Sequence, residues 1–327
     1  MKQLIQRIQK AKNIILSTHR QCDGDGLGAQ LALYHALVKI GKEVRILNVD
    51  PTPKKYAFLK GFQEIQYFER AYDPIAKTDL VLVFDTNDAR LLGELFHEFK
   101  KHSREVIFVD HHPVLEQGPT PTLGSYIDTN AASTGEIAYN IIKDLGIELD
   151  SNIAQNLYTS IVFDTQLFRF IRSSPNSHLI SAELLQHKIN AEEIHRSLFG
   201  NQTISKISFL AKALLQIEYY SDRKIAVLKV RDKDLIDHGL NTDETNDIID
   251  MIMNIESIEV AVVFREDGVD DYKISFRSKG KYRVLQIAED LGGGGHPFSA
   301  GAYKKGNFDQ LKSKTLSLML THFKLVS

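Results

Sequence analysis

The chain lacks several features that would place it in other classes of protein. It has 327 residues, a single cysteine and no tryptophan. One cysteine, Cys22, excludes an internal disulfide and fits a reducing compartment, so we expect a cytoplasmic protein in which Cys22 is a small filler residue. No apolar stretch approaches the roughly 20 residues of a membrane span, and the amphipathic N-terminus lacks the apolar core of a secretory signal. We therefore expect no membrane partner.

The chain also lacks an excess of positive charge. Lys and Arg number 40 against 42 Asp and Glu, which gives a net charge of −2. Proteins that bind a long nucleic acid normally have a basic balance or a large basic stripe, so we expect a short substrate and no long nucleic acid. The apolar content of 43% and charged content of 25% are ordinary for a globular protein. The length suffices for two domains.

What the sequence does have is acidic and histidine residues directly after predicted elements. Residues 13–18, 79–84 and 105–109 are apolar runs that predict buried parallel strands, and 152–163 predicts a helix. The polar residues that follow these elements are His19, Asp23, Asp25, Asp85, Asp110, His111, His112 and Asp164. Each group alone is typical of a turn or a helix cap. Because ligands bind at the carboxyl ends of parallel strands, the groups together predict one acidic, imidazole-containing pocket.

The residue types of this pocket predict bound metal. Crowded carboxylates repel one another and need a cation or protons. Carboxylate and imidazole together suit Mn²⁺, Co²⁺, Fe²⁺ or Zn²⁺. Six strong ligands are too many for one catalytic zinc but suit two ions that share a carboxylate: His19, Asp23, Asp25, Asp85, His111 and Asp164. Since such metal pairs clamp a displacement at phosphorus, we infer metal-assisted hydrolysis of a phosphate ester.

The order of predicted elements indicates an α/β fold. In the first half, strands alternate with helices, such as 27–40 ending at Gly41 and a helix opened by Ser133 in a capping box with Glu136. This alternation predicts a parallel sheet covered by helices on both faces. We place the metal-binding domain at 1–190, a helical connector at 191–215 and a smaller α/β domain at 216–327.

The stretch 176–215 is predicted to be mostly helical. Its apolar residues are expected to be buried: Leu179, Ile180, Leu184, Leu185, Ile194, Leu198, Ile207, Leu210 and Leu214. In the last domain we expect strands at 224–230, 259–265 and 272–277, a helix at 244–255 and an amphipathic helix over the last 20 residues.

Strand 272–277 and the glycine run 292–295 predict an anion site in the second domain. Along the strand, Lys273, Ser275 and Arg277 face one side, and Arg277 suits a phosphate because its guanidinium bonds two oxygens at once. Four successive glycines exceed what a helix cap needs and allow N–H groups to turn toward an anion. Arg265 and Arg283 are weaker candidates, supported only by their charge.

Asp110-His111-His112, with the upstream His19-x-x-x-Asp23-x-Asp25 and the isolated Asp85, resembles the DHH phosphoesterase superfamily. That superfamily includes RecJ exonucleases, family II inorganic pyrophosphatases and the oligoribonuclease/pAp phosphatases called nanoRNases. All four motifs of the DHH domain are present in order. The run 292–301 matches the glycine-rich motif of the associated DHHA1 domain, so the resemblance covers essentially the whole chain.

The resemblance implies roles for the matched residues, with two divalent ions, expected to be Mn²⁺, as cofactors. One ion would be held by His19, Asp23 and Asp85. The other would be held by Asp25, Asp85, His111 and Asp164, with Asp85 bridging the two. A water or hydroxide between the ions would be the nucleophile.

Two further residues of the third motif receive roles by the same resemblance. His112 would face the substrate phosphate, and Asp110 would orient the histidine pair. In the second domain the resemblance implies a grip on the terminal phosphate or nucleotide by Arg277, His296 and the glycine segment with Gly293, Gly294 and Gly295. Ser275, which shares the polar face of the strand with Arg277, is a further candidate substrate-binding residue.

The chain departs from the usual motifs at two places. Arg20-Gln21-Cys22 replaces a more typical Asn-Pro pair, and Gln166 stands where Gly often follows Asp-Thr. Neither change removes a ligand. We therefore expect an active enzyme in which substrate choice differs in detail.

These motifs best support the hypothesis that the protein is a Mn²⁺-dependent phosphoesterase of the nanoRNase type. It would cut very short RNA oligonucleotides to mononucleotides and remove the 3′-phosphate of pAp. The first domain would supply the metals and the second the phosphate and base contacts. Two alternatives stay open, a phosphodiesterase for cyclic or linear dinucleotides and a catalytically silent nucleotide-binding regulator, and a homodimer is also left open.

Overall fold

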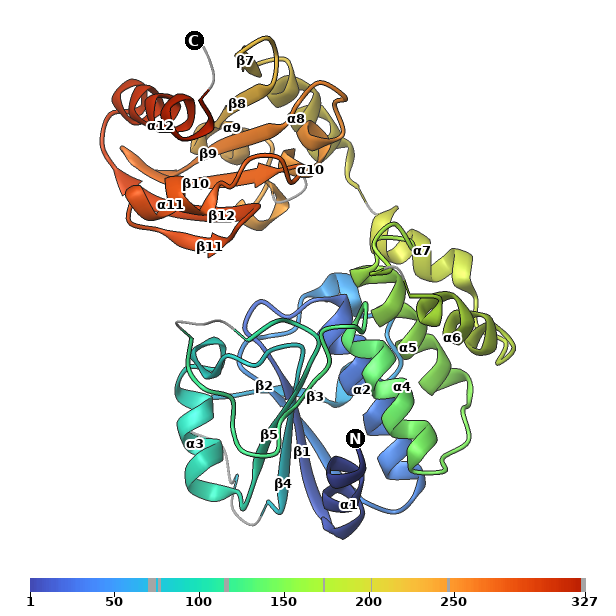
Figure 1. The fold of residues 1–327 in the computed structure, drawn as a ribbon. Coiled ribbons are helices and arrows are strands. Elements are labelled where there is room, and N and C mark those ends of the chain that lie inside the picture. The colour runs from blue at the N-terminus through green and yellow to red at the C-terminus, as the bar shows by residue number, and fades with distance from the viewer. Residues whose placement is uncertain are drawn as a thin grey trace. The chain divides into compact units, whose positions relative to one another are not determined.

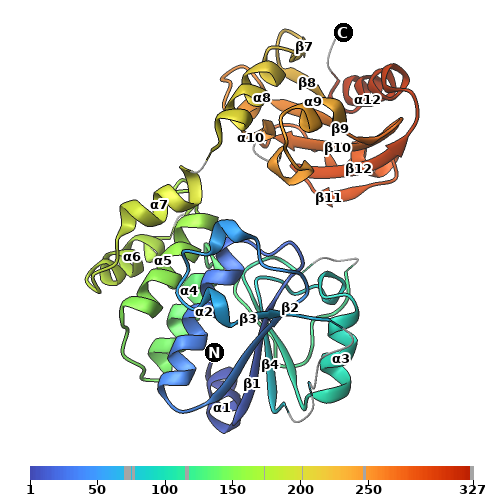
Figure 2. The ribbon, with the colours of Figure 1, turned by 180° about the vertical axis from the view of Figure 1, so that it is seen from behind.

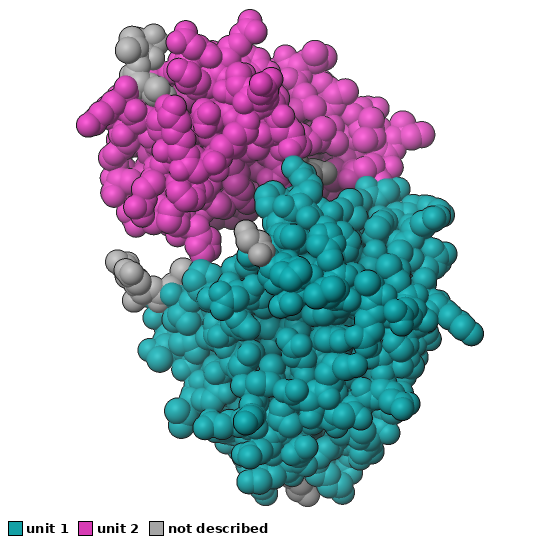
Figure 3. Space-filling model, turned by 45° about the vertical axis from the view of Figure 1, so that its right-hand side comes forward, with its two compact units in different colours: residues 1–201 teal, residues 202–327 magenta. Residues whose placement is uncertain are grey.

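The computed structural model of the chain describes residues 1–69, 75, 78–114, 118–172, 174–200, 202–245 and 248–324. It divides into two compact units, residues 1–201 and 202–327 (Figure 3). The boundary falls inside the stretch expected as a connector. Helix α7 (Ala191–Phe199) therefore belongs to the first unit and helix α8 (Ile204–Leu214) to the second.

The first unit is built on a six-stranded sheet in the order β3-β2-β1-β4-β5-β6, and all its strand pairs are parallel (Figure 1). The order reverses beside β1, which is the switch point where open α/β sheets bind ligands. The expected parallel sheet is confirmed. Its strands are β1 (Asn13–Thr18), β2 (Glu43–Asn48), β3 (Ile65–Tyr67), β4 (Leu80–Phe84), β5 (Val106–Asp110) and β6 (Tyr126–Ile127).

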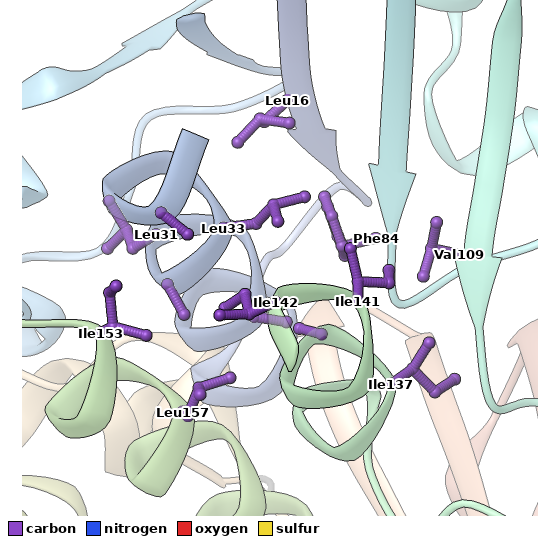
Figure 4. Packing of buried hydrophobic residues seen from close by; sticks show 14 of the residues in the cluster. Leu16, Leu31, Leu33, Phe84, Val109, Ile137, Ile141, Ile142, Ile153 and Leu157 are labelled. Atoms are coloured by element: carbon purple, nitrogen blue, oxygen red, sulfur yellow. The ribbon is translucent and has the colours of Figure 1, made fainter. Parts of the chain in front are cut away.

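Helices cover both faces of this sheet because successive strand residues point to opposite sides. Leu16, Phe84 and Val109 pack under α2, α4 and α5 (Figure 4). Ile15 and Phe108 face the other side, where α3 lies (Figures 1 and 2). The helices of the unit, besides α7, are α1 (Lys2–Lys10), α2 (Gly24–Lys39), α3 (Glu94–His102), α4 (Thr134–Asp144), α5 (Ser151–Asp164) and α6 (Asn176–Leu185), with short 3-10 turns at Lys54–Tyr56, Phe62–Glu64 and Ala89–Leu91.

Side-chain caps begin the helices that carry the candidate site. Asp23 precedes α2 and accepts hydrogen bonds from the N–H groups of Asp25 at 3.0 Å and Gly26 at 3.4 Å. Ser133 precedes α4 and accepts from the Glu136 N–H at 3.3 Å, as the capping pattern predicts. These bonds fix where each helix starts and hence where its first residues point.

The second unit is built on a mixed six-stranded sheet in the order β11-β12-β10-β9-β8-β7, in which only the β8–β9 pair is parallel. Its strands are β7 (Glu218–Tyr220), β8 (Ile225–Val230), β9 (Val260–Gly268), β10 (Asp271–Ser278), β11 (Gly294–His296) and β12 (Ser299–Lys305). Its helices, besides α8, are α9 (Asp232–Asp237), the 3-10 turn Thr242–Thr245, α10 (Ile248–Met253), α11 (Leu285–Asp290) and α12 (Phe308–Phe323). Of the expected helices, residues 246–247 and 325–327 lie outside the described part of the chain.

The two faces of the second sheet are covered differently. Ile274, Phe276 and Ala300 pack with residues of α11 and α12 on one face. On the other face, Ala261 and Val263 of β9 pack with residues of α8, α9 and α10. Neighbouring positions on β10 and β12 of that face stay half-buried or exposed, so this part of the sheet presents polar side chains.

Several apolar residues of the stretch 176–215 are exposed, contrary to expectation. Leu179 is 65% exposed, Leu185 45% and Ile207 52%. In α6 the apolar residues Ile180 and Leu184, four residues apart, lie on the buried face, and one helix face is too narrow to bury Leu179 and Leu185 as well. The expected burial is confirmed for Ile180, Leu184, Ile194 and Leu210, and Leu198 and Leu214 are partly buried. Within the described part of the chain, no helix is both long and apolar enough to cross a membrane.

Candidate metal centre

The polar residues predicted from the first half of the sequence meet at the carboxyl edge of the parallel sheet. His19 follows β1, Asp85 follows β4, and Asp110 is the last residue of β5, which neighbours β4. Asp164 is the last residue of α5, as expected. Because the ends of adjacent parallel strands meet at one edge, residues far apart in the sequence become neighbours.

A first group of possible ligands consists of His19, Asp23 and Asp85, whose ligand atoms all lie within 4.8 Å of one another. The His19 Nε2 atom is 3.4 Å from Asp85 Oδ2, and its Nδ1 atom is 2.7 Å from the Arg20 carbonyl oxygen. A proton on Nδ1, donated to that carbonyl, leaves the Nε2 lone pair facing the carboxylates, as a metal ligand requires.

A second group consists of Asp25, His111 and Asp164. The His111 Nε2 atom is buried and has no hydrogen-bond partner among the described residues. It lies 3.5 Å from Asp25 Oδ2 and 3.4 Å from Asp164 Oδ2. Ligands about 2.1 Å from one tetrahedral ion stand ~3.4 Å apart, so these spacings fit atoms that surround an ion. The donor set therefore fits a divalent metal.

Asp85 presents one oxygen to each group. Its Oδ2 atom faces His19, while its Oδ1 atom lies 3.7 Å from His111 Nε2 and accepts a hydrogen bond from the Thr134 hydroxyl at 3.2 Å. Its backbone is left-handed, with φ of 62°, which is unfavourable for a residue with a side chain. Such strain persists where the surroundings demand it, as at functional sites.

Burial and mutual repulsion perturb the carboxylates. Burial, followed by the charges of Asp25 and Asp23, raises the pKa of Asp85 well above its usual range. The same causes raise the pKa of Asp164 to about 8, opposed by His112 and Arg172. Burial also raises the pKa of Asp23. Because these carboxyl groups resist ionisation, a bound cation would stabilise their ionised forms strongly.

Asp110 and His112 form a hydrogen-bonded pair beside these groups. Burial raises the pKa of Asp110, but the hydrogen bond and charge of His112 outweigh it, so that the pKa is lowered. The His112 Nδ1 atom lies 2.9 Å from Asp110 Oδ1, which keeps the pKa of His112 above its usual value although burial alone would lower it. Asp110 also accepts from the His111 N–H at 2.8 Å and from the Asn87 amide at 2.6 Å. Asp110 therefore contacts the ring of His112 and the backbone of His111.

The structure adds supporting residues that the sequence interpretation missed. Asp25 accepts from the N–H groups of Thr134 at 2.9 Å and Gly135 at 3.2 Å, and from the Ser160 hydroxyl. Asn87 follows β4 closely, so the strand-end rule that singled out Asp85 would also have found it. Thr134 and Ser160 lie inside helices, where no local sequence signal marks them.

Cys22 is buried, and none of the candidate groups of metal ligands among the described residues includes it. Burial, followed by the charges of Asp23 and Asp50, raises the pKa of its thiol to about 12. This agrees with the expectation that Cys22 is a filler residue.

The candidate phosphate residues of the second unit form rows across its sheet. Strand register places His296 of β11 opposite Ser299 of β12, and Ser299 opposite Arg277 of β10. The next row contains Gly294, Gly301 and Ser275. Arg277 donates a hydrogen bond to the Ser299 hydroxyl and has no carboxylate partner among the described residues.

The first two residues of the glycine run, Gly292 and Gly293, form the end of helix α11. Gly292 has φ of 75°, and its N–H donates to the Glu289 carbonyl at 2.7 Å. The Gly293 N–H donates to the Ala288 carbonyl at 2.7 Å, which completes a Schellman end of α11. These two amides are therefore engaged, contrary to the expectation that they turn toward an anion. Gly294 has open space beside it and stays a candidate.

The weaker arginine candidates lie elsewhere. Arg265 is 9% exposed, and its guanidinium donates to Asp267 at 2.6 Å and 2.8 Å and to the Thr242 carbonyl at 3.1 Å. Arg283 lines a cavity of about 760 Å³ with Tyr282 and Phe323, beside the end of α12. Neither arginine belongs to the row of Arg277 and His296.

Comparison with known proteins agrees with this arrangement. Residues 13–161 match the model of the DHH family N-terminal domain, and residues 222–319 match the model of the DHHA1 domain. A Thermus thermophilus protein named bifunctional oligoribonuclease and PAP phosphatase NrnA is 30% identical, over 93% of this chain and 88% of that protein. A Bacillus subtilis protein of the same name is 28% identical, over 92% of each chain.

A solved structure shares the whole fold. The crystal structure of an exopolyphosphatase-related protein from Bacteroides fragilis superposes with a TM-score of 0.90 at 22% identity, covering 99% of this chain and 96% of that one. At this identity the likeness concerns the fold alone. The order of elements in both units is therefore one that occurs in known proteins.

Proposed function

Because the chain belongs to the DHH family, we propose that it is a two-metal phosphoesterase that hydrolyses very short oligoribonucleotides to mononucleotides. We further propose that it converts pAp to AMP and phosphate, that its ions are Mn²⁺, and that it works in the cytoplasm. Support for this substrate class comes from the names of the relatives, which are oligoribonucleases and PAP phosphatases. The charge balance adds support, since a net charge of −2 suits a short substrate.

The observation that carries the proposal is the sharing of Asp85 between two ligand groups. One group is His19 with Asp23, and the other is His111 with Asp25 and Asp164. Each group faces a different oxygen of Asp85. A shared carboxylate is the arrangement that holds two ions close enough to act on one phosphate.

The ions, when bound, would neutralise the carboxylates, polarise the phosphate and lower the pKa of the attacking water. His112 is suited to supply a proton to the leaving oxygen, because Asp110 raises its pKa and its side chain is 47% exposed. Asp110 holds the His112 ring in one orientation. Arg277 and His296 would bind a phosphate or nucleotide of the substrate, since both lie on the polar part of the second sheet.

Product analysis tests this proposal. Mn²⁺-loaded protein is incubated with pAp, with 5′-phosphorylated RNAs from dinucleotide to heptanucleotide, and with cyclic di-AMP, and the products are separated by ion-exchange chromatography. We expect mononucleotides from the shortest RNAs and AMP from pAp, with an Asp85→Asn variant as the inactive control. Cleavage confined to cyclic or linear dinucleotides would replace the proposal with a dinucleotide phosphodiesterase. Binding without any turnover would indicate a regulator.

A further inference from the structure

Arg172 lies behind a histidine of the candidate metal centre. Its Nη1 atom donates to the Thr129 carbonyl at 3.0 Å, and its Nη2 atom is 3.3 Å from Nδ1 of His111. The opposite nitrogen of the same ring faces Asp25 and Asp164. The residue is exposed and has φ of 48°. None of the sequence motifs singled it out.

The Nδ1 atom of His111 has two neighbours that make opposite demands. The Ala131 carbonyl oxygen, 3.2 Å away, can only accept a hydrogen bond, whereas the Arg172 guanidinium can only donate one. With a proton, Nδ1 bonds to Ala131; without one, it accepts from Arg172. It therefore satisfies only one of these neighbours at a time.

Metal binding decides between the two neighbours. An ion at Nε2 of His111 requires the lone pair of that nitrogen, so the ring proton must sit on Nδ1. That proton would then be donated to the Ala131 carbonyl, and the Nη2 group of Arg172 would face an N–H that it cannot bond. The guanidinium would keep its bond to Thr129 but lose its contact with the ring.

The net charge of the metal centre suggests what the freed Arg172 guanidinium would bind. Two divalent ions, if bound, would balance the four carboxylates of the ligand groups, so an incoming phosphate anion would meet a centre without net positive charge. The guanidinium of Arg20, which follows His19, donates to two carbonyls, those of Arg90 and Leu91. The guanidinium of Arg172 would keep one such bond, to Thr129, and have more N–H groups left for a phosphate. The Arg172 charge acts on both His111 and Asp164. Its planar fork suits two phosphate oxygens at once.

We propose that Arg172 is a ligand of the substrate phosphate, and that its guanidinium leaves the His111 ring for that phosphate once the metals bind. This inference rests on the proposed function of the same site. Arg172 would then be a specificity-determining residue. Its guanidinium supplies a positive charge at a centre where the carboxylate ligands cancel the charge of the metal ions.

The test separates metal binding from phosphate binding. Isothermal titration calorimetry measures Mn²⁺ affinity without substrate, and then the affinity of the Mn²⁺-loaded protein for inorganic phosphate, in wild type, Arg172→Ala and Arg172→Lys. Arg104→Ala is the matched control, because Arg104 pairs with Asp79 at the opposite end of the sheet, 3.5 Å away. The KM and kcat for pAp follow on the same samples.

We expect Arg172→Ala to bind Mn²⁺ as tightly as wild type or tighter, because a cation beside the ligands is gone. Its phosphate affinity should fall about tenfold or more, and its KM for pAp should rise by a similar factor with a smaller change in kcat. Arg172→Lys should recover part of the loss, since it restores the charge without the fork. Arg104→Ala should leave both affinities, the KM and the kcat unchanged.

A purely structural role would give a different pattern. If Arg172 only anchors the segment at Thr129, Arg172→Ala weakens Mn²⁺ binding and lowers the melting temperature while phosphate affinity is unchanged, and the inference is overturned. If wild type hydrolyses no nucleotide, the proposed function fails. The inference about Arg172 is then still decided by the binding of inorganic phosphate, which requires no turnover.

Discussion

The two units both contain a six-stranded sheet, yet they present polar side chains in different ways. In the parallel sheet of the first unit, the candidate residues stand at the ends of strands and helices and are largely buried together. In the mixed sheet of the second unit, Arg277, Ser275 and Lys273 lie along one strand face, with same-face neighbours ~6.8 Å apart. They are half-buried, and each contacts its own neighbours across the strands.

This difference determines how strongly the function of one site residue depends on the other site residues around it. At the edge of the parallel sheet, the pKa of Asp85 reflects the charges of Asp25, Asp23, Asp110 and Asp164, so the ligands act as a set. On the face of the mixed sheet, removal of one side chain leaves the other rows in place. We therefore expect loss of the whole activity from a single change in the first unit and graded losses in the second.

The sharpest test of a coupled set is Asp85→Asn. An amide cannot bridge two cations with two anionic oxygens, so we expect kcat to fall at least about 10³-fold on every substrate. The folded state should persist, because the change removes a buried carboxyl group whose pKa is raised. Steady-state kinetics over a Mn²⁺ titration, with circular dichroism as the control for folding, measures both effects. Activity within tenfold of wild type would refute the two-metal proposal.

The glycine run offers a matched pair in the second unit. A Cβ atom at Gly293 would lie 2.0 Å from the Gly301 carbonyl oxygen, whereas at Gly294 it meets nothing within 4 Å. We expect Gly293→Ala to lower the free energy of unfolding by about 2–4 kcal/mol and Gly294→Ala to leave it within about 0.5 kcal/mol. Urea unfolding measures both. Equal effects at the two positions would contradict the close approach of Gly293 to the backbone of β12.

Arg277→Ala tests whether losses on the sheet face are graded. The substitution removes a bidentate phosphate donor without touching the metal ligands, so kcat/KM for pAp should fall about 10–100-fold. The rate on bis-p-nitrophenyl phosphate should stay close to that of wild type. Equal losses on both substrates would assign Arg277 to the catalytic core or to the fold.

Stability against pH should distinguish metal-free from metal-loaded protein. The pKa of Asp164 is about 8 in the folded state, against about 3.9 in an unfolded chain. The folded state therefore holds a proton that the unfolded state releases, so this stabilisation is lost as pH rises from about 4 to 8. We expect the melting temperature of the metal-free protein to fall by about 3–6 °C between pH 5 and pH 8. With saturating Mn²⁺, calorimetry should show a melting temperature that is flat or rising with pH, and a parallel fall would contradict the metal assignment.

The smallest expected effect concerns backbone strain after the fourth motif. Gln166 has φ of 48°, a left-handed conformation that glycine adopts without strain. Gln166→Gly should stabilise the protein by up to about 1 kcal/mol, and Ser221→Gly, at φ of 50° in the β7–β8 turn, is the control in the second unit. Thermal denaturation of the two variants measures the change. Destabilisation confined to Gln166→Gly would show that the glutamine side chain holds its loop.

The first unit was the more predictable half because parallel strands deliver their ends to one edge whatever their exact register. Apolar runs before His19, Asp85 and Asp110 therefore sufficed to predict that these residues meet. In the second unit, β7, β11 and β12 were not predicted, since three-residue strands and a glycine-rich hairpin carry little periodic signal. The use of the Gly293 amide by α11 depends on the position of a carbonyl, which the sequence does not encode locally.

The supporting residues show another limit. Arg172 contacts the site from a loop, and nothing in its sequence neighbourhood distinguishes it from an ordinary surface residue. Asn87, by contrast, follows β4 closely enough for the strand-end rule to have found it. The exposure of Leu179 follows from which side of α6 meets the core, and that depends on packing between helices. Sequence patterns thus predicted which residues the strands position, and the structure was needed for residues that tertiary contacts position.

Asp25 has a consequence for reading the sequences of relatives. Its carboxylate holds the start of α4 through Thr134 and Gly135 and ties α5 through Ser160. A descendant that abandoned catalysis would still need this aspartate to keep its helices together. It would be free to replace His111, whose Nε2 atom has no hydrogen-bond partner among the described residues. Among such chains, presence of the aspartate would indicate that the fold is kept, and presence of the histidine would indicate that catalysis is kept.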